Sequence, residues 1–245
     1  MTAVLRYTAP ADGRECRCMA GEQPKISKVE VQEIFPTPLW IVDLDPTTYR
    51  PLNDALRAEI ERLLTPRPTI PKGANWQTAQ DLHESPKFAR LCEVVTMAAR
   101  GALRWWGLEA HPLVITGCWA NINPPGAHHP RHTHPNNLLS GTYYIQSGPD
   151  AAEIVVSDPR PQAHVLMPRP TQFNARNTNS LSVKVQDGRI VLFPSWLQHH
   201  VVSNQSELER ISIAFNFMIP HYTETLSAPM WKGNVATRKA EQDAP

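Results

Sequence analysis

Histidines gather in two short stretches of this chain. Four of its ten histidines fall within residues 128–134, and a second pair stands at His199 and His200. Neutral imidazole is the commonest protein ligand for Zn, Fe, Ni and Cu. A tight cluster joined by one distant histidine is how a β-barrel builds a metal site from strands far apart in sequence. The spacing therefore predicts one metal site shared by both stretches.

The alternation of side chains along a strand selects among these histidines. His132 and His134 are two residues apart, so both imidazoles face the same side of a strand. In residues 193–201 the odd positions are more apolar than the even ones, which favours His199 over His200 as the inward residue. The predicted metal ligands are His132, His134 and His199.

Arg210 opens a strand whose two faces differ in character. One face is polar or small (Arg210, Ser212, Ala214, Asn216) and the other is apolar (Ile211, Ile213, Phe215, Phe217). An arginine on the polar face needs an anionic partner, because burying a lone guanidinium is costly and its planar fork matches a carboxylate. This partner is either a ligand carboxylate, to which Tyr144 could add its phenol, or the nearby Glu207 or Glu209.

Composition limits the classes of function. The 245 residues, 41% hydrophobic and 19% charged, suffice for one sizeable core, and the net charge of +1 predicts neither nucleic-acid nor membrane binding. No apolar run reaches 18 residues, and the N-terminus lacks the apolar segment of a secretion signal. Four cysteines at no disulfide or metal spacing favour a reducing compartment, so a cytoplasmic protein is expected.

Helical patterns dominate the first half of the chain and strand patterns the second. Helices are predicted over 46–64 and from Ser85 to about Gly107, the second with serine at its N-cap and proline at its first position. Strands are predicted at 35–42, 113–115, 118–123, 138–146, 152–157, 163–167, 182–185, 189–193, 199–202 and 211–219. This order indicates an α+β fold in which helices buttress an antiparallel sandwich or open barrel. Three parts are expected: a flexible N-terminal tail (1–27), a single domain (28–220) and an irregular C-terminal tail (221–245).

Two stretches carry a family resemblance. Gly126–Ile145 (GAHHPRHTHPNNLLSGTYYI) and Asp187–Phe217 (DGRIVLFPSWLQHHV, then ERISIAFNF) resemble a small family of bacterial 2-oxoglutarate/Fe(II)-dependent oxygenases. More distantly they are similar to the prolyl-4-hydroxylase branch of that superfamily. The resemblance implies a double-stranded β-helix of the jelly-roll or cupin type, with Fe(II), 2-oxoglutarate and O₂ as cofactor and cosubstrates.

The resemblance also implies roles for individual residues. His132 and His199 take the places of metal ligands, and Arg210 takes the place that grips the far carboxylate of 2-oxoglutarate. Residues that match cosubstrate- or substrate-facing positions are Ser212, Tyr144, Trp119, Asn121 and Asn123. His134 departs from the superfamily pattern, because a carboxylate usually stands there. The third ligand is therefore His134, a carboxylate such as Asp158, or water.

The expected reaction is oxidative decarboxylation of 2-oxoglutarate coupled to hydroxylation, desaturation or cyclisation of an amino-acid, peptide or biosynthetic substrate. Two alternatives stay open: a cupin-like three-histidine dioxygenase that uses no 2-oxoglutarate, and a non-catalytic barrel that binds zinc or no metal. One of His128 and His129 is expected at the entrance of the site. Further candidates for the substrate pocket are Trp76, Trp105, Trp119, Asn123 and His128.

Overall fold

A computed structural model describes residues 26–148, 153–160, 162, 165 and 168–222. The chain divides into two units, residues 1–37 and 38–245, and the described residues of the first form no helix or strand. Most of the two predicted tails lies outside the described residues, so the predicted domain limits at 28 and 220 stay a prediction. The predicted strand at 163–167 also lies largely outside them.

Two α-helices form where their patterns predict them. Helix α1 covers Pro46–Leu64, and the Asp45 carboxylate caps it by accepting a 2.8 Å hydrogen bond from the Thr47 amide. Helix α2 covers Ala89–Trp105 and follows two single 3-10 turns, η1 (Leu82–Glu84) and η2 (Pro86–Phe88). Ser85 is the N-cap of η2, so the predicted start at Ser85 is confirmed with a 3-10 first turn. In the described residues no helix is both long enough and apolar enough to span a membrane.

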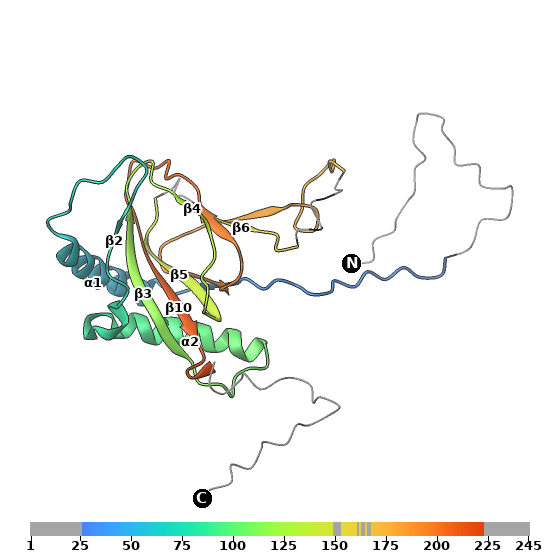
Figure 1. Ribbon diagram of the computed structural model, residues 1–245, viewed down its shortest axis with the longest axis horizontal. Coiled ribbons are helices and arrows are strands. Elements are labelled where there is room, and N and C mark those ends of the chain that lie inside the picture. The colour runs from blue at the N-terminus through green and yellow to red at the C-terminus, as the bar shows by residue number, and fades with distance from the viewer. Residues whose placement is uncertain (1–25, 149–152, 161, 163–164, 166–167, 223–245) are drawn as a thin grey trace, which may run out of the picture. The chain divides into compact units, whose positions relative to one another are not determined.

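The strands form two antiparallel sheets (Figure 1). The larger sheet has the order β1-β8-β5-β10-β3-β2: β1 is Trp40–Asp43, β8 Arg189–Pro194, β5 Leu139–Gln146, β10 Arg210–Met218, β3 Val114–Asn123 and β2 Trp76–Gln77. The smaller sheet has the order β4-β9-β6-β7: β4 is His129–His132, β9 His199–Val201, β6 Ile154–Ser157 and β7 Ser180–Val183. The predicted strands at 113–115 and 118–123 are one strand, β3. It pairs with β10 through a register shift that leaves Thr116 without a partner opposite.

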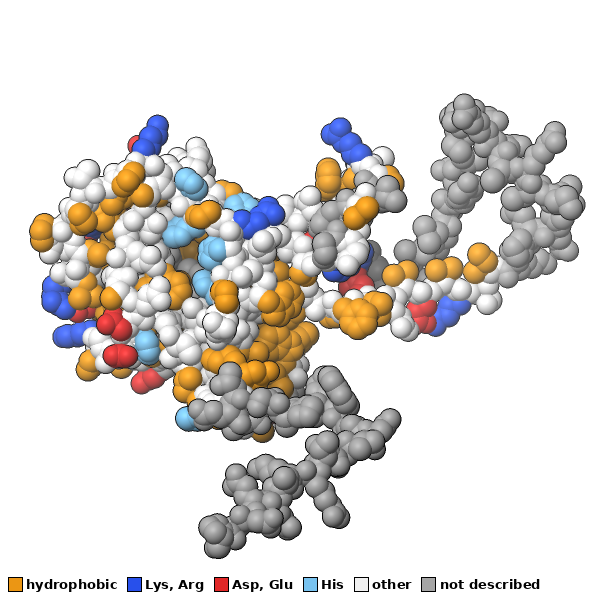
Figure 2. Space-filling model, viewed as in Figure 1, with side chains coloured by type: hydrophobic (Ala, Val, Ile, Leu, Met, Phe, Trp, Pro, Cys, Tyr) orange, Lys and Arg blue, Asp and Glu red, His pale blue; other side chains and the backbone are white. Residues whose placement is uncertain are grey.

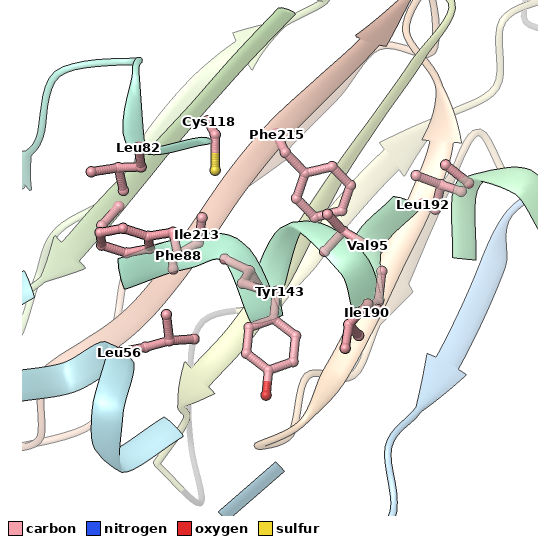
Figure 3. Close-up of a cluster of buried hydrophobic side chains, with 14 of the residues drawn as sticks. Leu56, Leu82, Phe88, Val95, Cys118, Tyr143, Ile190, Leu192, Ile213 and Phe215 are labelled. Atoms are coloured by element: carbon pink, nitrogen blue, oxygen red, sulfur yellow. The ribbon is translucent and has the colours of Figure 1, made fainter. Parts of the chain in front are cut away.

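Both helices cover one face of the larger sheet. Figure 3 shows Val95 of α2 beside Phe215 of β10 and Leu56 of α1 in the same cluster, and all three side chains are at most 1% exposed. At 25 cal/mol per Å², burying one such side chain contributes about 1.5–3 kcal/mol. The apolar face predicted for residues 211–217 thus packs in the core. The opposite face of β10 therefore points toward the smaller sheet.

One buried polar residue ties α1 to the sheet. The Asn53 side chain donates to the Ile145 carbonyl at 2.8 Å and accepts from the Tyr143 hydroxyl at 2.6 Å. Both contacts satisfy polar atoms that would be costly to bury unpaired. Tyr143 therefore has a structural role in the core, and its neighbour Tyr144 points to the opposite face of β5.

The two sheets together form a double-stranded β-helix with an α+β arrangement, as the sequence predicted. β4 and β9 of the smaller sheet lie across from β3, β5 and β10, and residues from all five strands line one cavity. A second apolar cluster closes the space between the sheets near Ile154, Val183 and Phe193. The space between the sheets is therefore partly packed and partly hollow.

Candidate active site

The hollow part of the barrel contains a cavity of about 240 Å³. Figure 2 shows histidine side chains gathered around a hollow on the visible face of the molecule. The predicted residues His132, His134, His199, Arg210 and Ser212 all line this cavity. Sequence segments about 80 residues apart are thus brought to one site.

The three predicted metal ligands converge. His132 of β4 pairs directly with His199 of β9, and the His134 amide donates to the Ser195 carbonyl at 2.9 Å. One ring nitrogen from each histidine lies within 4.8 Å of those of the other two. The ring centroids are 4.3–5.1 Å apart. This spacing allows three imidazoles to share one ion.

Backbone carbonyls orient two of the rings. The Nδ1 atoms of His132 and His199 lie 2.8 Å from the carbonyl oxygens of Pro130 and Leu197 respectively. Because a carbonyl oxygen only accepts, each Nδ1 carries a proton, which leaves Nε2 as the ring nitrogen available to a metal. A hydrogen bond from the distal ring nitrogen is the usual support of a metal-bound histidine. The donor set therefore fits a divalent transition metal.

Burial keeps the rings in the form that binds metal. Burial, with a smaller effect of the neighbouring histidines, lowers the pKa of His134 and of His199 to about 4, although the hydrogen bond to Leu197 partly opposes the shift of His199. Both imidazoles are consequently neutral at neutral pH, and a metal ion needs to displace no proton from them.

Asp158, considered from the sequence as a third ligand, has another role. Its carboxylate accepts two hydrogen bonds from Arg160, at 2.9 and 2.7 Å. Within the described part of the chain, the one group of three or more residues arranged to hold a metal ion is His132, His134 and His199. The geometry therefore favours His134 as the third ligand.

A buried polar network supports the segment that carries His134. The Ser140 hydroxyl lies 2.7 Å from the Ser195 hydroxyl and donates to the Asn216 side-chain oxygen at 2.7 Å. Ser195 is fully buried, and its carbonyl receives the His134 amide. Asn216, on the polar face of β10, thus helps to position the predicted metal ligand His134 through Ser140 and Ser195.

Arg210 lies at another part of the cavity wall and is only 3% exposed. Its Nη2 donates to the Asn123 side-chain oxygen at 3.3 Å, and its guanidinium lies 5.8 Å from the centre of the Tyr144 ring. Burial lowers the pKa of Arg210, and Tyr144 opposes that change. Glu209, one of its two alternative partners, instead forms a 2.7 Å ion pair with Arg67. A carboxylate ligand in the cavity would stabilise the buried cation.

Hydroxyl and amide groups lie in one row beside Arg210. Ser212 pairs with Asn121 on β3 and with Tyr144 on β5, and all three residues line the cavity. Burial raises the pKa of Tyr144 to about 12, so its phenol is protonated and able to donate to an anion. Asn123 does not line the cavity; it is fully buried behind Arg210 and holds the guanidinium.

The structure places only some of the predicted pocket residues at the cavity. Trp119 lines the cavity, with its ring centroid 6.0 Å from that of His134. Trp76 instead packs under Arg67, and Trp105 is 60% exposed at the end of α2. His129, not His128, is the member of that pair that faces the cavity.

Sequence reasoning missed two polar residues of the cavity wall, Asn75 and Gln77. They flank Trp76 in and beside β2, which is too short to show an alternating pattern. Thr142, on the same face as Tyr144, was recognisable from strand alternation alone.

A comparison with protein families found one match. Residues 117–216 match the family model described as "Putative 2OG-Fe(II) oxygenase", a stretch that includes the three histidines and Arg210. A search of curated proteins found no match to the chain.

Solved structures share the fold at low sequence identity. The 2-oxoglutarate-dependent epimerase SnoN from nogalamycin biosynthesis is 16% identical over 74% of this chain and 78% of its own, with a TM-score of 0.54. HygX from Streptomyces hygroscopicus, with nickel and 2-oxoglutarate bound, is 15% identical over 75% and 83%, with a TM-score of 0.53. A Pseudomonas putida prolyl-4-hydroxylase is 18% identical over 74% and 92%, with a TM-score of 0.50.

These likenesses confirm the predicted fold and the predicted family resemblance. Residues 117–216, the barrel region that carries the histidine triad and Arg210, are similar to the family described as putative 2OG-Fe(II) oxygenases, and the solved structures share the fold.

Proposed function

We propose that this protein oxidises a C–H bond of a small molecule, with Fe(II) held by His132, His134 and His199 and 2-oxoglutarate held by Arg210. The observation that carries the proposal is the common cavity: three convergent imidazoles and one buried guanidinium line the same space of about 240 Å³. A metal site alone fits many enzymes, whereas the buried arginine adds a place for a dicarboxylic acid.

The chain's own residues have separable tasks. The triad holds the metal, and the carbonyls of Pro130 and Leu197 fix the orientation of two of its rings, His132 and His199. Three neutral ligands cancel none of the metal's charge, so an anionic keto acid binds there more favourably than beside a carboxylate ligand. When bound, Fe(II), 2-oxoglutarate and O₂ supply oxidative decarboxylation to succinate and CO₂ together with the oxidising power for the substrate.

Arg210 orients the cosubstrate by its far carboxylate, with Ser212 and the protonated phenol of Tyr144 as additional donors. Asn123 holds the guanidinium from behind, so the fork is positioned before the anion arrives. Such preorganisation reduces the loss of side-chain freedom on binding. Hydroxylation is the proposed outcome, and desaturation or cyclisation needs only a different placement of the substrate.

The cavity wall favours a neutral, polar group on the substrate. Among the described residues that line it, Arg210 is the one with a permanent charge, and Asn75, Gln77 and Asn121 add carboxamides. Carboxamides both donate and accept hydrogen bonds, and they match hydroxyl and amide groups. The substrate is accordingly an amino-acid, peptide or biosynthetic small molecule that presents such a group near the metal.

The test is succinate formation from 2-oxoglutarate by anaerobically Fe(II)-loaded protein after exposure to O₂. His199→Ala and Arg210→Met are compared with the parent protein, and His128→Ala and Arg90→Ala serve as matched controls because neither side chain lines the cavity. We expect turnover in the parent and the controls, and its loss in both site variants.

Binding measurements separate the alternatives. If the parent binds iron and 2-oxoglutarate without turnover, a substrate is needed to start the reaction, and candidate neutral molecules are added to the same assay. If the parent binds metal but no 2-oxoglutarate, the proposal is wrong and the three-histidine dioxygenase that uses no keto acid replaces it.

A further inference from the structure

His129 is a cavity residue to which the proposed function gives no task. It begins β4 and pairs with Val201 of β9, whereas His132 at the other end of β4 pairs with His199. Val201 also lines the cavity, on the same face of β9 as His199 and about 6.5 Å further along that strand. His129 therefore lies at the end of β4 opposite to the predicted metal ligand His132.

The ring of His129 presents a polar atom with no protein partner. Its Nε2 is buried, and among the described residues no atom forms a hydrogen bond with it. Buried polar nitrogens in native proteins are nearly always satisfied, so an exception at a cavity wall indicates a group supplied by a ligand.

Arg210 lines the same cavity as His129 but from the other sheet, on β10. Burial lowers the pKa of His129 to about 4, and the positive charge of Arg210 is the next largest cause. Both side chains therefore border the space in which an anion held by Arg210 would lie.

We infer that His129 donates a hydrogen bond from Nε2 to the far carboxylate of the keto acid, from the side of the barrel opposite Arg210. This role rests on the proposed function. A carboxylate has about four lone-pair sites. A bidentate Arg210 takes two of them, and His129 shares the other two with Ser212 and Tyr144. His129 would be a binding residue that makes the site selective for dicarboxylic keto acids, and it would not bind the metal.

Two ligands and three variants test the role by titration calorimetry on Ni(II)-loaded protein, which avoids oxidation of iron. The ligands are 2-oxoglutarate and 2-oxopentanoate, which has the same chain length but no far carboxylate. The variants are His129→Phe, which keeps a ring without nitrogen, His129→Gln, whose amide nitrogen replaces Nε2, and His128→Ala as the control on the neighbouring histidine.

We expect His129→Phe to weaken 2-oxoglutarate binding by about ten- to a hundredfold, as for loss of a hydrogen bond to a charged group. Binding of 2-oxopentanoate should not change, His129→Gln should restore most of the affinity, and His128→Ala should behave as the parent. Circular dichroism of each variant confirms that it is folded.

Three results would overturn the inference. Unchanged 2-oxoglutarate affinity in His129→Phe would mean that His129 does not contact the carboxylate. Equal weakening of both keto acids would indicate a general structural role. A parent protein that binds neither ligand would refute the proposed function itself, and the parent titration alone reveals this case.

Discussion

The two faces of β10 divide stability and chemistry between alternate residues of one strand. Ile211, Ile213, Phe215 and Phe217 pack under the helices, and Arg210, Ser212 and Ala214 line the cavity. The core face gains free energy by removing apolar surface from water, whereas the cavity face keeps a cation buried at a cost. Substitutions on the two faces should consequently change different measurements.

The largest effect on stability is expected from Phe215→Ala. The side chain is fully buried between the sheet and α2, so its removal leaves a cavity and should lower the free energy of unfolding by about 3–5 kcal/mol. Urea denaturation of the metal-free protein measures this. The fraction that stays folded should bind 2-oxoglutarate as the parent does. A selective loss of 2-oxoglutarate binding would contradict the separate roles of the two faces of β10.

Arg210→Met should have the opposite profile. Loss of the bidentate partner should reduce 2-oxoglutarate affinity by about 3 kcal/mol, or roughly a hundredfold. The free energy of unfolding should stay equal or rise, because an apolar side chain of similar volume replaces a buried cation. Calorimetry and urea denaturation on the same sample check both parts. Strong destabilisation would show that Arg210 serves the core.

Ser140→Ala tests whether every polar residue on the cavity side serves binding. The change leaves the Asn216 side-chain oxygen and the Ser195 hydroxyl without their common partner, at a cost of about 1–3 kcal/mol. Thermal denaturation should register this loss, and metal affinity should fall as well, since Ser195 positions His134. A loss of stability with unchanged metal affinity would confine the network to a structural role.

The metal-free protein should also show a pH-dependent stability. Burial lowers the pKa of His129, His134 and His199 to about 4, against about 6.5 in an unfolded chain. The folded state then binds fewer protons than the unfolded state between these values, so stability should fall as pH drops from about 6.5 toward 4. Melting temperatures across this range measure it, and His134→Gln should flatten the dependence. An equal slope in both proteins would contradict these lowered pKa values.

Strand alternation made much of this site predictable. The parity of residues 193–201 selected His199, and the parity of residues 210–217 placed Arg210 opposite the core, because side chains alternate strictly along a paired strand. Both helices were equally readable from their caps and apolar spacing. The sequence alone does not favour His134 over Asp158 as the third metal ligand. The structure does, because it shows the Asp158 carboxylate hydrogen-bonded to Arg160.

Residues without a regular pattern were not predictable. Asn75 and Gln77 reach the cavity because a two-residue strand adds to the edge of the larger sheet, and nothing in the local sequence indicates this. Trp76, between them, faces away and packs against Arg67. The sequence predicts two strands where the structure has the single strand β3. The reason is that Thr116 and Gly117 interrupt the apolar alternation at the point where the pairing with β10 shifts.

A crystal structure of the protein with Ni(II) and 2-oxoglutarate tests the central claim most directly. We predict anomalous density for one metal ion bound by the Nε2 atoms of His132 and His199 and by a ring nitrogen of His134. The far carboxylate of the keto acid should lie on Arg210. A metal held by Asp158, or a keto acid bound away from Arg210, would contradict the account.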